Sequence, residues 1–257
     1  MHQHDLGLHH DLPRLLGRRR VLGLLAGAGL ATLTACAGPG GPGGGGSAAK
    51  GAEGEIPQET SGPFPGDESN GPNVLAENGV VRQDIRSSVG SLSGTAEGVP
   101  LTIRMTVTDV AGAALPGAAV YVWHCDREGT YSIYDLEDQN YLRGVQVADD
   151  AGVVTFTSIF PGAYSGRWPH IHFEVFPSID QATAGANAIT TSQIALPERA
   201  CAQVYATAGY EQSVENFAEL SLESDNVFSD GVEKQLAAVT GAVAGGLTAA
   251  LTVPVAA

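Results

Sequence analysis

The chain has few basic residues and a clear excess of acidic ones. Its 257 residues include 13 Lys plus Arg and 28 Asp plus Glu, which gives a formal net charge of -15 at pH 7. Nucleic acids and anionic membrane surfaces attract proteins through clustered positive charge. The composition therefore argues against nucleic-acid binding and against electrostatic attachment to a membrane.

Long apolar runs are also missing. The run at residues 21–33 is too short to span a bilayer as a stable anchor. A second apolar stretch, residues 236–257, is interrupted by three glycines and by Pro254. This interruption predicts a turn and a final strand in place of a membrane span.

The N-terminal segment has the features of an export signal. The first apolar run follows Arg18-Arg19-Arg20, as in a twin-arginine signal. At its end, residues 33–36 (LTAC) are typical of a lipobox, in which Cys36 becomes lipidated after cleavage; an A-x-A-like cut nearby, without a lipid, is the alternative. We expect an extracellular protein, either free or anchored to the membrane by that lipid.

The composition divides the chain into three parts. We expect a signal peptide with lipobox at residues 1–36, a Gly/Pro-rich flexible tether at residues 37–58 and one domain at residues 59–257. About 200 residues are enough to bury a sizeable core.

Cysteine is scarce as well. With Cys36 assigned to the lipid, only Cys125 and Cys201 remain. In an oxidising compartment such a pair predicts one disulfide, and two free buried thiols are the alternative.

Helix signals are sparse, and residues 231–239 carry the best of them. Alternating apolar residues instead predict strands at residues 101–108, 119–123, 152–157 and 170–175, with Gly- and Pro-containing turns between them. Short strands at this spacing favour a β-sandwich.

Histidine is rare in the body of the chain. Four of the seven histidines lie in the N-terminal segment, and the body has only His124, His170 and His172. The last two are separated by one residue in a predicted strand, so both imidazoles would project from the same face. Together with Tyr131 and Tyr164 they make a candidate set of two nitrogen and two oxygen metal ligands. Phenolate is a hard donor, so this mixture suits ferric iron. An ordinary histidine pair beside core aromatic residues is the alternative.

Three stretches carry a family resemblance: residues 123–132 (WHCDREGTYS), 161–164 (PGAY) and 167–173 (RWPHIHF). Their order of Tyr, Tyr, Arg, His and His resembles the intradiol ring-cleaving dioxygenases, the superfamily of the catechol 1,2- and protocatechuate 3,4-dioxygenases. The resemblance covers roughly residues 60–228. It implies a mainly β fold, a β-sandwich catalytic domain with few short helices.

The resemblance also implies a mechanism. One mononuclear non-haem Fe(III) would be held by Tyr131 and His170 as equatorial ligands and by Tyr164 and His172 as axial ones. A small aromatic diol would bind as a dianion and displace Tyr164, and O2 would cleave its ring to a cis,cis-muconate-type diacid. Arg167 would stabilise negative charge that develops during the reaction.

Two other readings stay open at this point. Residues 108–122 also look like the opening strands of transthyretin-like sandwiches, which bind partners without chemistry. The second alternative is a structural zinc or copper site on His170 and His172, which would leave the two tyrosines without a role. The sequence does not decide between a monomer and a homodimer.

Overall fold

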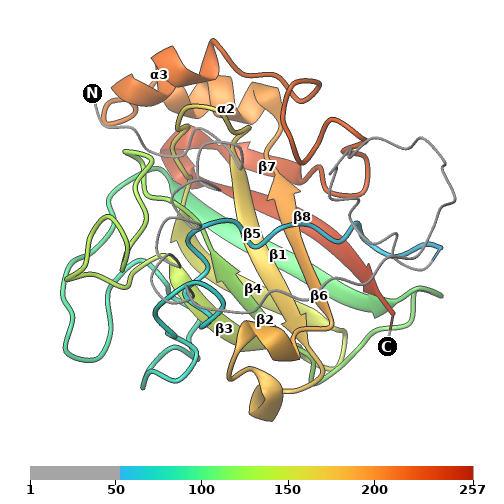
Figure 1. The fold of residues 1–257 in the computed structure, drawn as a ribbon. Coiled ribbons are helices and arrows are strands. Elements are labelled where there is room, and N and C mark those ends of the chain that lie inside the picture. The colour runs from blue at the N-terminus through green and yellow to red at the C-terminus, as the bar shows by residue number, and fades with distance from the viewer. Residues whose placement is uncertain (1–52, 257) are drawn as a thin grey trace, which may run out of the picture.

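The computed structural model describes residues 53–256. Two four-stranded sheets pack face to face as a β-sandwich, with strand orders β4-β1-β8-β7 and β3-β2-β5-β6 (Figure 1). The strands are β1 (Pro100–Asp109), β2 (Ala119–Trp123), β3 (Arg143–Val147), β4 (Val153–Ile159), β5 (His170–Phe176), β6 (Thr190–Ala195), β7 (Ala238–Ala242) and β8 (Gly246–Val255). The predicted mainly β fold is confirmed.

The helices of the described residues are short. They are α2 (Glu198–Tyr205), α3 (Glu211–Phe217) and the 3-10 turns η1 (Ile179–Gln181), η2 (Gly185–Asn187) and η3 (Val243–Gly245). The helices α2 and α3 lie together at one end of the sandwich (Figure 1). Between residues 53 and 256, no helix is both long and apolar enough to cross a membrane.

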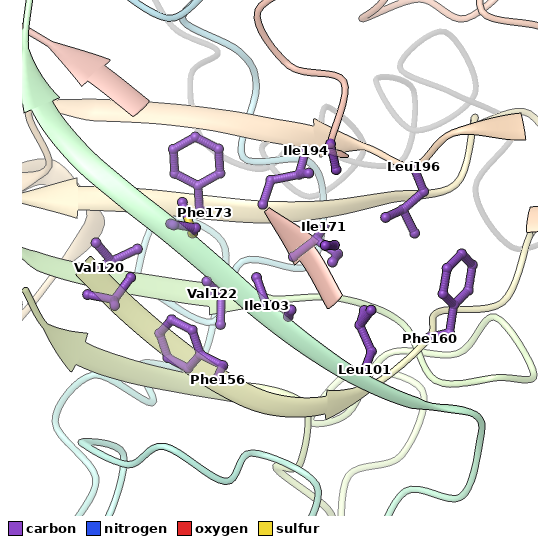
Figure 2. Packing of buried hydrophobic residues seen from close by; sticks show 14 of the residues in the cluster. Leu101, Ile103, Val120, Val122, Phe156, Phe160, Ile171, Phe173, Ile194 and Leu196 are labelled. Carbon is purple, nitrogen blue, oxygen red and sulfur yellow. The ribbon is translucent and has the colours of Figure 1, made fainter. Parts of the chain in front are cut away.

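The core lies between the two sheets. Branched and aromatic side chains from alternate positions of β1, β2, β4, β5 and β6, and from the residues directly after β4 and β6, meet there. Figure 2 shows this for Leu101, Ile103, Val120, Val122, Phe156, Phe160, Ile171, Phe173, Ile194 and Leu196. Burial of one such side chain contributes about 1.5–3 kcal/mol. Because side chains alternate along a strand, the residues between these core positions face away from the opposite sheet.

Strands β2 and β5 are buried on both faces. Their second face packs against a separate aromatic cluster that includes Tyr121, Trp123, Tyr131 and Tyr164. The antiparallel register pairs Trp123 with His172. The predicted histidine strand therefore has a covered polar face as well as a core face.

The predicted strands β1, β2, β4 and β5 are confirmed, and so is a final strand, β8. The helix predicted at residues 231–239 is wrong. Residues 232–236 make a single turn, after which Leu236 bridges Ala195 at the end of β6 and the chain enters β7. Pairing with two sheets outweighs the local helical preference there.

The predicted signal peptide and most of the tether, residues 1–52, lie outside the described residues. The tether prediction extended to residue 58, but Ile56 is fully buried in the core and its N–H donates to the Pro254 carbonyl at 2.9 Å. The folded domain therefore includes the last residues assigned to the tether.

Candidate metal centre

The two strand histidines face each other on β5. His170 and His172 project from the face opposite Ile171, and their Nε2 atoms lie 2.9 Å apart. Both side chains are buried, with 3% exposed. This arrangement follows from their spacing of two along an extended chain.

The two predicted tyrosines reach the same point from loops. Tyr131 follows the turn after β2, and Tyr164 lies between β4 and β5. The Tyr164 Oη atom lies 3.3 Å from the Tyr131 Oη and 3.2 Å from the His170 Nε2. The structure thus brings together all four residues that were predicted as metal ligands.

The two histidines have the protonation state that binding of a metal cation requires. The His170 Nδ1–H donates to the Trp168 carbonyl at 2.6 Å, which leaves the Nε2 lone pair directed at the cluster. Burial, followed by the charge of Arg167, lowers the pKa of His170 to about 3. Burial, with His170 next in effect, lowers the pKa of His172 well below its ordinary value. Both imidazoles are therefore neutral, and each can offer a nitrogen lone pair to a metal ion.

Two neutral imidazoles and two phenols suit ferric iron, because phenolate is a hard oxygen donor and a strongly polarising cation removes the phenol proton. No group of three or more His, Cys, Asp and Glu side chains within residues 53–256 could hold a metal ion without the tyrosines. The buried His172 Nδ1 has no hydrogen-bond partner among residues 53–256. These residues fit an iron ion held through the Nε2 and Oη atoms.

Aromatic and glycine residues enclose the cluster. The Trp123 ring stacks on His172 with centroids 4.9 Å apart and an interplanar angle of 5°. The Phe64 ring packs on Tyr131 at 5.0 Å. Gly62 has φ +70°, and a Cβ there would lie 3.2 Å from the His172 Cε1. The segment that contains Gly62 and Phe64 therefore covers the rings of these candidate ligands closely.

Arg167 is buried beside the cluster and is held by Asp225. Its Nε donates to the Asp225 Oδ2 at 3.0 Å, and its Nη2 donates to the Gln193 Oε1 at 2.7 Å. Burial lowers the pKa of Arg167, but the charges of Tyr164 and Asp225 outweigh it, so the pKa lies above its ordinary value. The predicted cation is thus present beside the cluster, and it forms an ion pair with the Asp225 carboxylate.

Sequence reasoning missed the residues that hold Arg167. Asp225 lies in the loop after α3, where no motif points to the arginine, and Gln193 lies on β6, which was not predicted. The register of β5 and β6 places Gln193 opposite His172. Recognition of β6 as a strand would have placed Gln193 beside the histidines.

A second buried carboxyl group shares the histidine face of β5. Glu174 lies two residues after His172, and burial together with Asp67 raises its pKa to about 9. Glu174 is therefore a neutral acid at pH 7, and Thr191 donates to it at 3.4 Å.

His124 lies outside the ligand cluster. Its ring nitrogens bond the Cys125 carbonyl and the Ser158 hydroxyl, both at 2.7 Å. Because both nitrogens are engaged within the fold, His124 has a packing role.

The structure does not contain the predicted disulfide. Cys125 and Cys201 are both free and buried. The Cys125 thiol lies 3.5 Å from the Gly162 carbonyl, and the Cys201 thiol lies 3.8 Å from the Leu196 carbonyl. Each thiol therefore donates to a different backbone carbonyl, and two free buried thiols are the arrangement that was the alternative. Cys36 lies outside the described residues.

Comparisons with known proteins agree with this site. Residues 70–187, which include the four candidate ligands, match the family model described as Dioxygenase. The chain is 36% identical to a catechol 1,2-dioxygenase of a Pseudomonas strain over 69 residues, 26% of this chain and 23% of that protein. It is 32% identical to a hydroxyquinol 1,2-dioxygenase of Corynebacterium glutamicum over 104 residues, 34% of this chain and 35% of that protein.

The fold is also found in a solved structure. An intradiol ring-cleavage dioxygenase from Tetranychus urticae superposes with a TM-score of 0.60 at 24% identity, over 77% of this chain and 93% of that one. The matches to the two curated relatives span about a third or less of those proteins' lengths. The match over residues 70–187 and the partial matches to these relatives support membership of the intradiol ring-cleaving dioxygenase superfamily, and the solved structure shows that the fold is shared.

Proposed function

We propose that the protein is a non-haem Fe(III)-dependent dioxygenase that cleaves a catecholic ring between its two hydroxylated carbons. The observation that carries the proposal is the convergence of two phenol oxygens and two neutral imidazole nitrogens, through contacts of 2.9–3.3 Å. Neither a packed core nor a binding surface needs these four groups at one point.

The four residues would hold the ion through Tyr131 Oη, Tyr164 Oη, His170 Nε2 and His172 Nε2. Bound ferric iron would supply the one-electron chemistry that lets a catecholate react with dioxygen. Tyr164 is the most exposed of the four, at 9% against 2% for Tyr131. Tyr164 would be the ligand that a substrate displaces, and its oxygen would then accept a substrate proton.

Arg167 would supply a fixed positive charge. Asp225 and Gln193 hold its guanidinium, so the charge is oriented before a substrate arrives. Preorganised charge of this kind stabilises negative charge on reacting oxygens more than mobile water does. The buried, aromatic surroundings of the ligands exclude water and strengthen the effect.

The substrate class follows from the relatives. They are named for catechol, hydroxyquinol and chlorocatechol, so we propose a small aromatic diol with adjacent hydroxyl groups and O2 as substrates. The product would be a cis,cis-muconate-type diacid.

The test is oxygen uptake by the iron-loaded protein with catechol, chlorocatechol and hydroxyquinol, followed by mass spectrometry of the product. With 18O2, both labelled atoms should appear in the product, one in each new carboxyl group. Tyr131→Phe should abolish uptake, whereas Tyr210→Phe, which removes a buried hydroxyl bonded to Val99 and Phe160, should not. An iron-loaded protein inert towards all three diols would contradict the proposed activity.

We also propose export by the twin-arginine pathway, on the sequence of residues 18–36 alone. Mass spectrometry of the mature protein from its native cell would show an N-terminal lipidated Cys36 if the lipobox is used. An unprocessed N-terminus would contradict the proposal.

A further inference from the structure

One turn occurs three times in this fold. Asp109, Asp126 and Asp149 each begin an Asp-x-x-Gly segment in which the carboxylate Oδ1 accepts backbone N–H groups from the residues two and four positions later, at 2.8–3.1 Å. The glycine of each segment has a positive φ, between +73° and +89°. The Asp and Gly residues therefore define the turn in each of its three positions.

The turn at Asp126 carries additional bonds. Its second oxygen, Oδ2, accepts the Thr130 hydroxyl at 2.6 Å and the Tyr141 hydroxyl at 3.0 Å. Asp126 is buried, with 4% exposed, whereas Asp149 is exposed. A buried carboxylate with four bonds holds its neighbours more rigidly than an exposed one.

The same turn contacts both candidate phenol ligands. Tyr131 directly follows Thr130, whose carbonyl accepts the Asp126 N–H at 2.8 Å. On the other side, the Asp126 carbonyl accepts the N–H of Gly162 at 2.9 Å, two residues before Tyr164. A Cβ on Gly129 would lie 3.2 Å from the Tyr164 Cβ, so turn and ligand backbone are in close contact.

We propose that Asp126 is a positioning residue that fixes the Tyr131 and Tyr164 oxygens relative to each other for binding of the ferric ion. The inference rests on the proposed function, because it takes both phenols as ligands. The Oη atoms lie 3.3 Å apart although the two tyrosines are 33 residues apart in sequence. The Asp126 turn bonds the backbone beside each of them, which reduces the freedom that metal binding must otherwise remove.

Three variants separate positioning from general stability. Asp126→Asn keeps the Oδ1 acceptor but replaces Oδ2 with an amide that cannot accept from Thr130 and Tyr141. Thr130→Val removes one anchoring hydroxyl at nearly constant volume, and Thr130→Ser restores it. Asp149→Asn is the matched control, because it makes the same change in a turn with no tyrosine ligand beside it.

The readouts are the Fe(III) dissociation constant from chelator competition, the wavelength of the visible tyrosinate band and the Tm of the iron-free chain. We expect Asp126→Asn and Thr130→Val to weaken iron binding by about 10- to 100-fold and to shift the band, as loss of a residue that orients a metal ligand does. Thr130→Ser and Asp149→Asn should retain wild-type iron affinity and band.

The outcomes are distinguishable. If wild-type protein binds no ferric iron with a visible band, the proposed function fails. If wild type shows the band but Asp126→Asn and Thr130→Val keep its wavelength and affinity, the positioning role is wrong and the proposed function stands. Should Asp126→Asn fail to fold, the comparison of Thr130→Val with Thr130→Ser decides alone.

Discussion

Arg167 and Asp225 form a buried ion pair that links two segments 58 residues apart, with Nε 3.0 Å from Oδ2 and only 6% and 1% of the side chains exposed. Asp225 also accepts the Trp168 N–H at 2.7 Å. The aspartate thus orients both the arginine and the start of the histidine strand.

Loss of this aspartate charge should destabilise the fold. Asp225→Asn leaves the Arg167 cation buried without its counter-charge, and removal of one partner of a buried pair costs about 3–5 kcal/mol. The free energy of unfolding from urea titration measures the effect. Asp84→Asn removes a partner of the exposed Arg86–Asp84 pair and should cost no more than about 1 kcal/mol. Equal losses would show that Asp225 contributes nothing specific.

Arg167 itself should matter for rate more than for iron binding. Arg167→Lys keeps the positive charge but loses the planar fork that bonds Asp225 and Gln193. We expect kcat with catechol to fall by about 100-fold or more while the iron content and visible band persist. Stopped-flow and steady-state oxygen uptake would measure kcat. A variant with unchanged kcat would remove Arg167 from the proposed chemistry.

Gly62 offers a steric test of the ligand cluster. Gly62 and Gly90 have the same φ of +70°, so an alanine at either carries the same backbone strain, about 1–2 kcal/mol. Only at Gly62 does the added Cβ meet a ligand, because nothing lies within 4 Å of a Cβ at Gly90. Gly62→Ala should therefore weaken iron binding, measured by chelator competition, and Gly90→Ala should not. Indistinguishable affinities would mean that the segment with Gly62 does not press on His172.

The strands were predictable from the sequence where alternation of apolar residues was clear, as at residues 119–123 and 170–175. Of the four candidate ligands, the two histidines were predictable because histidine is rare in the body of the chain and the spacing of His170 and His172 fixes their common face. The two tyrosines were identified from their place in the stretches 123–132 and 161–164. Asp225 and Gln193 were not, since their role depends on how a distant loop and an unpredicted strand pack against Arg167. The disulfide prediction was wrong because the count of cysteines contains no information on their separation.

Glu59 should make stability depend on pH near neutrality. Burial and the Asp230 carboxylate raise its pKa from 4.5 to about 7, although Gln235 and Arg167 oppose the shift; Asp225 adds to it. Between these two pH values the native state binds more protons than the unfolded state, so this group's contribution to stability falls as the pH rises.

Glu59→Gln removes that contribution. Between pH 5 and pH 8, the free energy of unfolding of the Glu59→Gln variant, measured by urea titration, should fall less than that of the wild type. Glu137→Gln, which removes an exposed carboxylate, is the control and should follow the wild-type curve. Parallel curves for Glu59→Gln and wild type would contradict the raised pKa.

Tyr131, Tyr164, His170 and His172 are proposed to form one ferric site. The most direct measurement is the visible absorption spectrum of the iron-loaded protein, before and after anaerobic addition of catechol. Tyrosinate bound to Fe(III) should give a red-brown protein, and catechol should shift the band as it replaces Tyr164. A protein that stays colourless after Fe(III) reconstitution would contradict the account, and the two tyrosines would then be core aromatic residues.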